Sequence, residues 1–136
     1  MCVAPLQLDL FGARLTDLGT RFLRKLTGLA HLEICGGGIT DETVAIVATL
    51  PELRTVNLSQ NGGITDRASG LISSLPVLES LNLSNTNIGP GSLPSLALIT
   101  SLTSLSLYSC AFAASHTAAL RAALPRLLSL GVDEPV

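Results

Sequence analysis

The sequence has little charge and few aromatic residues. Charged residues make up 13% of its 136 positions, aromatic residues make up 3%, and tryptophan is absent. The 8 basic and 10 acidic residues give a formal net charge of −2. Because a protein that binds the phosphate backbone needs a basic face, we predict no nucleic-acid partner. The sequence also has no uninterrupted run of about 18 apolar residues, so we predict no membrane span.

Cysteine is scarce as well. The three cysteines, Cys2, Cys35 and Cys110, are widely spaced, odd in number and contain no C-x-x-C pair. This pattern argues against a disulfide scaffold and against a paired-cysteine metal site. No basic segment followed by a long apolar stretch opens the sequence, which argues against a secretory signal. We therefore expect a cytoplasmic protein that binds no metal or cofactor.

Leucine, by contrast, is abundant, with 28 of 136 positions, and it follows a long period. The pattern L-x-x-L-x-L, or its Ile and Val equivalents, begins near residues 5, 29, 53, 78, 102 and 127, at intervals of 24 or 25 residues. Recurrence at such a period is typical of stacked structural repeats. The spacing predicts a single domain over residues 1–136, with five repeats and the first strand of a sixth.

Each repeat contains two shorter periods. The L-x-L centre has period two and predicts a short strand with one buried face. Apolar residues about three apart follow, as in Val44, Val47 and Leu50, and predict a helix. Threonine–aspartate pairs suit the helix N-caps of the first three repeats, at Thr16–Asp17, Thr40–Asp41 and Thr65–Asp66. The last two repeats have no such pair, so we expect irregular segments around Ile88–Pro90 and Phe112–Ala114.

The full pattern, L-x-x-L-x-L-x-x-N/C/T, resembles that of leucine-rich repeat proteins, with Asn61, Thr86 and Cys110 at the final position. It is similar to the subclass of 24–26-residue repeats in ribonuclease-inhibitor-like and F-box-associated proteins. The resemblance implies an α/β right-handed solenoid, or horseshoe, with a parallel concave sheet and convex helices. It also implies a structural role for Asn61 and Cys110. Gly37 departs from the pattern in the second repeat.

Strand alternation places a second set of side chains on the concave face. This face is polar in the middle, and it has aromatic residues near its edges that suit interface anchors. The predicted protein-binding residues are Phe11, His31, Glu33, Asn57, Asn82 and Tyr108. Cys35 is expected on the same face, where a reactive or metal-binding role is the minor alternative. A face that only binds water is the competing interpretation.

Three further groups have modest alternatives. Asp9, His31 and Glu33 should approach one another, and an acidic binding patch is favoured over acid–base catalysis because no nucleophile accompanies them. The glycines at 36–38 predict a turn rather than a phosphate loop. His116 is expected on the solvated convex surface. The basic residues of the first helical region predict a solvated face, or else a docking patch for an acidic partner, at Arg14, Arg21, Arg24 and Lys25.

The leading functional hypothesis is a non-enzymatic protein–protein interaction module or scaffold. The alternatives are a substrate-recognition subunit of an F-box-type ubiquitin ligase, which rests on the resemblance alone, and a structural subunit of a large assembly. A hydrolase is the remote alternative. No polar caps are evident at the ends of the repeat array. We therefore expect the ends to be covered by a partner, by self-association or by structure that the pattern does not show.

Overall fold

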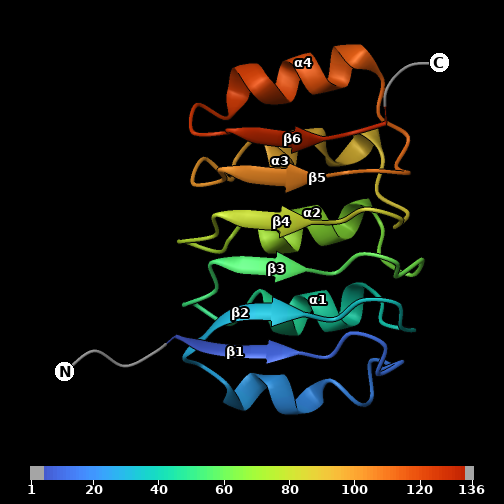
Figure 1. The fold of residues 1–136 in the computed structure, drawn as a ribbon, viewed down its shortest axis with the longest axis vertical. Coiled ribbons are helices and arrows are strands. Elements are labelled where there is room, and N and C mark those ends of the chain that lie inside the picture. Colours follow the sequence, from blue (N-terminus) through green and yellow to red (C-terminus); the bar gives the residue numbers. More distant parts are fainter. Residues whose placement is uncertain (1–4, 134–136) are drawn as a thin grey trace.

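The computed structural model describes residues 5–133, which form one six-stranded parallel sheet with strand order β1-β2-β3-β4-β5-β6. Figure 1 shows the strands stacked in chain order, with helices on one side of the sheet. The parallel sheet and helical layer match the predicted architecture. The strands are β1 (Leu6–Asp9), β2 (Leu29–Glu33), β3 (Thr55–Asn57), β4 (Ser80–Asn82), β5 (Ser104–Ser106) and β6 (Ser129–Gly131).

The sheet is held in register by one continuous apolar row. Each member of the row pairs with the equivalent residue of the next strand, 24 or 25 residues along the chain. From β2 to β5 these side chains are at most 2% exposed, because they pack against the helical layer. No single repeat buries its apolar side alone, so the hydrophobic effect favours stacking. The row consists of Leu8, Leu32, Val56, Leu81, Leu105 and Leu130.

The helical layer is uneven along the stack. Figure 1 places the 3-10 helix η1 and the longest helix, α4, at opposite ends. The helices are η1 (Arg21–Lys25), α1 (Asp41–Val47), α2 (Asp66–Ile72), η2 (Pro90–Ser92), α3 (Leu93–Leu96) and α4 (Ala114–Ala123). The fourth repeat is irregular, as expected, with a 3-10 turn that runs into one α-helical turn.

Two expectations for this layer are wrong. The fifth repeat is not irregular: its segment forms the ten-residue helix α4. His116 explains this, because its Nδ1 accepts the backbone N–H of Ala113 at 2.9 Å, as a capping side chain does, and the alanines that follow favour helix. In the first repeat, Thr16–Asp17 does not start an α-helix, and only the later 3-10 helix η1 forms.

The aspartates of the threonine–aspartate pairs bind the following repeat. Asp17 accepts hydrogen bonds from the backbone N–H of Thr40 at 2.8 Å, from the Thr40 hydroxyl at 2.7 Å and from the Thr43 hydroxyl at 2.8 Å. Asp41 accepts from the N–H and the hydroxyl of Thr65 in the same way. We call these contacts inter-repeat staples. Burial alone raises the pKa of Asp17, but these hydrogen bonds outweigh it and hold that pKa below its usual value.

The predicted N-caps are therefore only partly right. The Thr40 hydroxyl accepts the backbone N–H of Glu42 and caps α1, whereas the Thr65 side chain caps nothing. Asp66 makes the third staple, accepting the N–H of Gly89 at 2.7 Å. The fourth and fifth repeats have Pro90 and Ala114 in place of the aspartate, so neither residue can send a carboxylate staple onward.

The end of the leucine-rich pattern is held by Asn61, which is fully buried. Its Nδ2 donates to the carbonyls of Ile34, Leu58 and Ser59, and its Oδ1 accepts the N–H of Gly37 at 3.0 Å. A Cβ at Gly37 would lie 2.7 Å from the Leu15 carbonyl oxygen, which explains the departure from the pattern there. Asn61 is structural, as the resemblance implies.

Residues 1–4 and 134–136 lie outside the described part of the chain, and Cys2 is among them. The assignment of residues 1–136 to a single domain stays a prediction for that reason. Across residues 5–133, no helix combines the length and the hydropathy needed to cross a membrane.

Candidate functional site

The sheet face opposite the helices carries a hollow of about 670 Å³ that extends over five strands. We call this surface the open face. Four of the six predicted binding residues line the hollow: His31, Glu33, Asn57 and Asn82. The complete lining is Gln7, Leu8, Asp9, His31, Leu32, Glu33, Thr55, Val56, Asn57, Ser80, Asn82 and Ser106.

Period-two alternation builds this face. In β3, β4 and β5 the central residue is buried toward the helices, and its two neighbours are half-buried on the open side. Neighbouring strands are in register, so equivalent residues form rows across the sheet; Asn57 pairs with Glu33 on one side and with Asn82 on the other. Side chains from repeats 24 or 25 residues apart thereby reach one surface.

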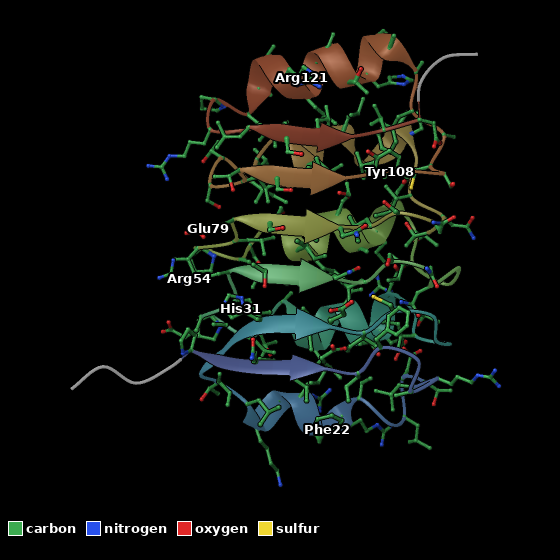
Figure 2. The ribbon with its side chains drawn as sticks, in the orientation of Figure 1. Phe22, His31, Arg54, Glu79, Tyr108 and Arg121 are labelled. Atoms are coloured by element: carbon green, nitrogen blue, oxygen red, sulfur yellow. The ribbon has the colours of Figure 1, made fainter. Side chains whose placement is uncertain are left out.

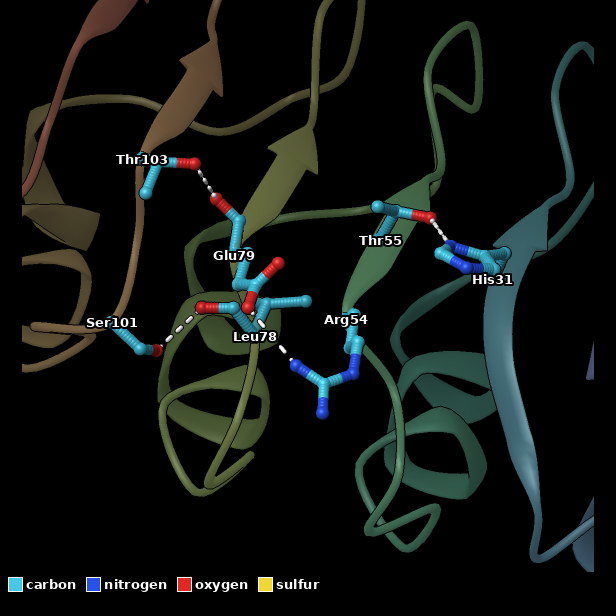
Figure 3. Close-up of polar contacts among 7 residues, drawn as sticks. All are labelled: His31, Arg54, Thr55, Leu78, Glu79, Ser101 and Thr103. Atoms are coloured by element: carbon cyan, nitrogen blue, oxygen red, sulfur yellow. Dashed lines mark hydrogen bonds and ion pairs between the residues drawn. The ribbon is translucent and has the colours of Figure 1, made fainter. Parts of the chain in front are cut away.

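Hydrogen bonds between strands fix the acidic end of the hollow. His31 Nδ1 and the Thr55 hydroxyl lie 2.6 Å apart, as Figure 3 shows. Asn57 Nδ2 donates to Glu33 Oε1 at 3.4 Å, a long contact. Among the described residues, no hydrogen bond joins His31 to a carboxylate, which is the contact that would orient a histidine general base. The arrangement is better suited to binding than to proton transfer.

The predicted aromatic residues lie outside the hollow. Phe11 follows β1 in a turn and is 66% exposed, and Tyr108 follows β5 and is 48% exposed. Figure 2 shows His31 on β2 and Tyr108 beyond the carboxyl end of β5. The Tyr108 ring lies over Gly131, where a Cβ would come within 2.5 Å of its Cε2 atom. The missing side chain at Gly131 leaves room for the ring.

The prediction that Cys35 lies on the open face is wrong. The residue is 2% exposed, and the Ser59 hydroxyl donates to its Sγ at 3.4 Å. Alternation ends with β2 at Glu33, and the chain then turns at Gly36, whose φ is +71°. Burial raises the pKa of the Cys35 thiol, which keeps it protonated and unreactive at neutral pH. Ser59 and Ser84, at the equivalent positions, are buried too.

Two features of the surface were not found by sequence reasoning. Arg54 and Glu79 form an ion pair at 3.0 Å beside the start of β3 and β4, outside the hollow (Figure 3). Both side chains are 49% exposed, so the pair contributes little to stability. Their 25-residue separation, one repeat, is the signal that pairs them. His116, expected to be solvated, is half-buried and caps α4.

The first repeat carries the largest cluster of exposed apolar side chains. Leu6, Phe11, Leu18 and Phe22 are 48%, 66%, 71% and 44% exposed. At the other end of the stack, Leu128 is 86% exposed. The basic residues of the first repeat are exposed beside this cluster: Arg14, Arg21, Arg24 and Lys25. Within residues 5–133, no group of three or more metal-ligating side chains comes together.

The comparisons with known proteins agree with this architecture. The family model described as Leucine Rich Repeat matches residues 77–98. Leiomodin-1 actin-binding site 2 is similar in structure, with a TM-score of 0.59 at 12% identity over 96% of this chain and 71% of that one. An internalin (InlF) from Listeria monocytogenes is similar with a TM-score of 0.54 at 20% identity. That match covers 83% of this chain and 37% of the internalin chain. Among curated proteins, none matches the sequence.

These similarities define the class of protein. The chain is a leucine-rich repeat protein, and its fold is an α/β leucine-rich repeat solenoid with an open parallel sheet. The predicted fold class is thereby confirmed. The finer assignment to the ribonuclease-inhibitor-like and F-box-associated subclass stays a prediction.

Proposed function

We propose that this protein is a non-enzymatic interaction module that binds a protein partner on the open face. The observation that carries the proposal is the hollow of about 670 Å³, which is lined by half-buried polar side chains from five strands. A surface built on strands and tied by hydrogen bonds between strands is preorganised, which lowers the ordering cost of binding. His31, Glu33, Asn57 and Asn82 are the proposed contact residues within the hollow, with Phe11 and Tyr108 as exposed anchors beside it.

Affinity purification from the native source tests the proposal. The double variant Asn57→Arg with Asn82→Arg fills the centre of the hollow with two long charged side chains, so partners captured by the wild type should be lost. The matched control is Ala118→Arg with Ala119→Arg, which adds the same two side chains to exposed positions on α4. If the partners are still captured by the first variant, the open face is not the binding surface.

The exposed apolar side chains of the first repeat favour a second candidate, end-on assembly with another copy or with a subunit of a larger complex. The edge of β1 is unpaired on one side, and Leu18 and Phe22 are exposed beside it. Light scattering over a range of concentrations should show association. The variant Leu18→Glu with Phe22→Glu should reduce it. A monomer that persists at high concentration would contradict this second function.

Two further proposals concern the surroundings. Cys35 and Cys110 are free thiols, which supports a reducing compartment and hence the cytoplasm. The hollow is lined by two carboxylates and by no lysine or arginine, which supports a protein partner over nucleic acid or an anionic membrane. Nothing in residues 5–133 favours the ubiquitin-ligase alternative over a general interaction module.

A further inference from the structure

Charge is distributed unevenly within the hollow. Both carboxylates of the lining, Asp9 and Glu33, lie at its β1–β2 end, where they are register partners on neighbouring strands. From β3 to β5 the lining polar groups are neutral hydroxyls and amides. The ion pair of Arg54 and Glu79 lies outside the lining and is neutral overall. One end of the hollow is therefore anionic, and the rest is uncharged.

Each carboxylate has one oxygen occupied and one available. Asp9 Oδ1 accepts the backbone N–H of Phe11 at 2.9 Å, and Glu33 Oε1 accepts the long contact from Asn57. Within residues 5–133, no hydrogen bond reaches Asp9 Oδ2 or Glu33 Oε2. Two carboxylates on adjacent strands repel each other, and a cation placed between them removes that repulsion. A lysine ammonium or an arginine guanidinium supplies the donors that such a site accepts.

The amides in the middle of the hollow have a fixed orientation. Asn82 Oδ1 accepts the backbone N–H of Ser84 at 3.0 Å, and Asn57 Oδ1 accepts that of Ser59 at 3.1 Å. Because an N–H must face the amide oxygen, each Nδ2 is turned away from its own turn. Asn82 Nδ2 has no hydrogen-bond acceptor among the described residues. It is a preoriented donor for an acceptor supplied from outside.

We propose that the open face recognises an extended peptide segment, with a lysine or arginine side chain between Asp9 and Glu33 and a main-chain carbonyl on Asn82 Nδ2. This inference rests on the proposed function and names the chemistry of the partner. Two to three strand spacings of about 4.8 Å separate the two subsites. An extended chain advances about 3.3 Å per residue, so the cation and the carbonyl lie about three or four residues apart.

Selection of phage-displayed random heptapeptides on the full-length chain tests the inference. The selected peptides should be enriched in lysine or arginine. Their affinity, measured with the corresponding synthetic peptides, should fall about tenfold or more in Asp9→Asn with Glu33→Gln, because a charge-assisted contact is lost. The control Glu42→Gln with Glu52→Gln makes the same change of charge at exposed positions outside the hollow and should leave the affinity unchanged.

The outcomes separate this inference from the proposed function. If selected peptides bind Asn57→Arg with Asn82→Arg as tightly as the wild type, the open face is not a binding surface and the proposed function fails. If that variant abolishes binding but the neutralised Asp9 and Glu33 variant does not weaken it, the function stands and the cation site is overturned. Peptides that lack lysine and arginine, or no selected peptides at all, also overturn the inference.

Discussion

The first and third repeats share one leucine spacing but differ in how completely they are built. In the third repeat, Leu53, Val56 and Leu58 are at most 2% exposed, and a seven-residue α-helix covers them. In the first repeat, Leu6 is 48% exposed, and the only helix is the 3-10 segment η1. The third repeat has neighbours on both sides, whereas β1 has one. Burial in this fold is thus supplied by adjacent repeats, and the stability of a repeat depends on its position.

The largest contrast is expected from truncating the same apolar row at two places. Leu81→Ala removes a side chain that is 1% exposed, at the centre of the sheet, and should lower the free energy of unfolding by about 3 kcal/mol. Leu8→Ala, at the half-buried end of the row, should cost about 1 kcal/mol because less area leaves the core. Urea unfolding of both variants measures the difference. Equal losses would show that burial does not vary along the stack.

Asn61→Ala is expected to cost about 2 kcal/mol, because it leaves the Gly37 N–H and the carbonyl of Ile34 without their buried partner. The comparison variant is Asn87→Ala, whose exposed Nδ2 bonds a single carbonyl, and it should change stability far less. The same urea unfolding assay compares the two. Similar losses would mean that burial of the Asn61 bonds adds nothing.

The staple from Asp17 joins the first repeat to the second, and its strength depends on pH. Its folded-state pKa lies below the unfolded value of 3.8, so its contribution is complete above about pH 5 and is lost as pH falls through the folded pKa. Asp17→Asn should therefore cost about 1 kcal/mol at pH 7, and the variant should lose less stability on acidification. Thermal unfolding between pH 7 and pH 3 measures both effects. Glu52→Gln, at an exposed carboxylate, is the control and should do neither.

The smallest effect is expected at the exposed end. Leu18 is 71% exposed, so Leu18→Ser should change the free energy of unfolding by less than about 0.5 kcal/mol. Thermal unfolding at low protein concentration measures this without contributions from association. A large loss there would show that Leu18 packs against the first repeat more tightly than its exposure indicates.

The sheet was predictable because its pattern is redundant. Period-two leucines recur at a constant interval, and each recurrence restates the same strand and the same register, so His31, Glu33, Asn57 and Asn82 reach one surface. Phe11 and Tyr108 lie in turns, where alternation no longer decides position. Cys35 was misplaced for the same reason, since the positive φ of Gly36 ends the strand pattern.

The staples could not be predicted from local patterns. Thr16–Asp17 fits a helix N-cap as well as Thr40–Asp41 does, and the partner of Asp17 is 23 residues away. The helix α4 was missed because its cap comes from a histidine at the third position of the helix rather than from a threonine–aspartate pair. In both cases a side chain satisfied backbone groups from an unexpected direction.

The direction of the staples has a consequence for synthesis of the chain. Each carboxylate belongs to the earlier repeat, and each donor belongs to the later one, as in Asp17 with Thr40 and Asp41 with Thr65. On the ribosome, where residues emerge from the N-terminus onward, every acceptor is made before its donor. A newly emerged repeat therefore meets a docking carboxylate already in place, and growth of the solenoid can proceed vectorially, one repeat at a time.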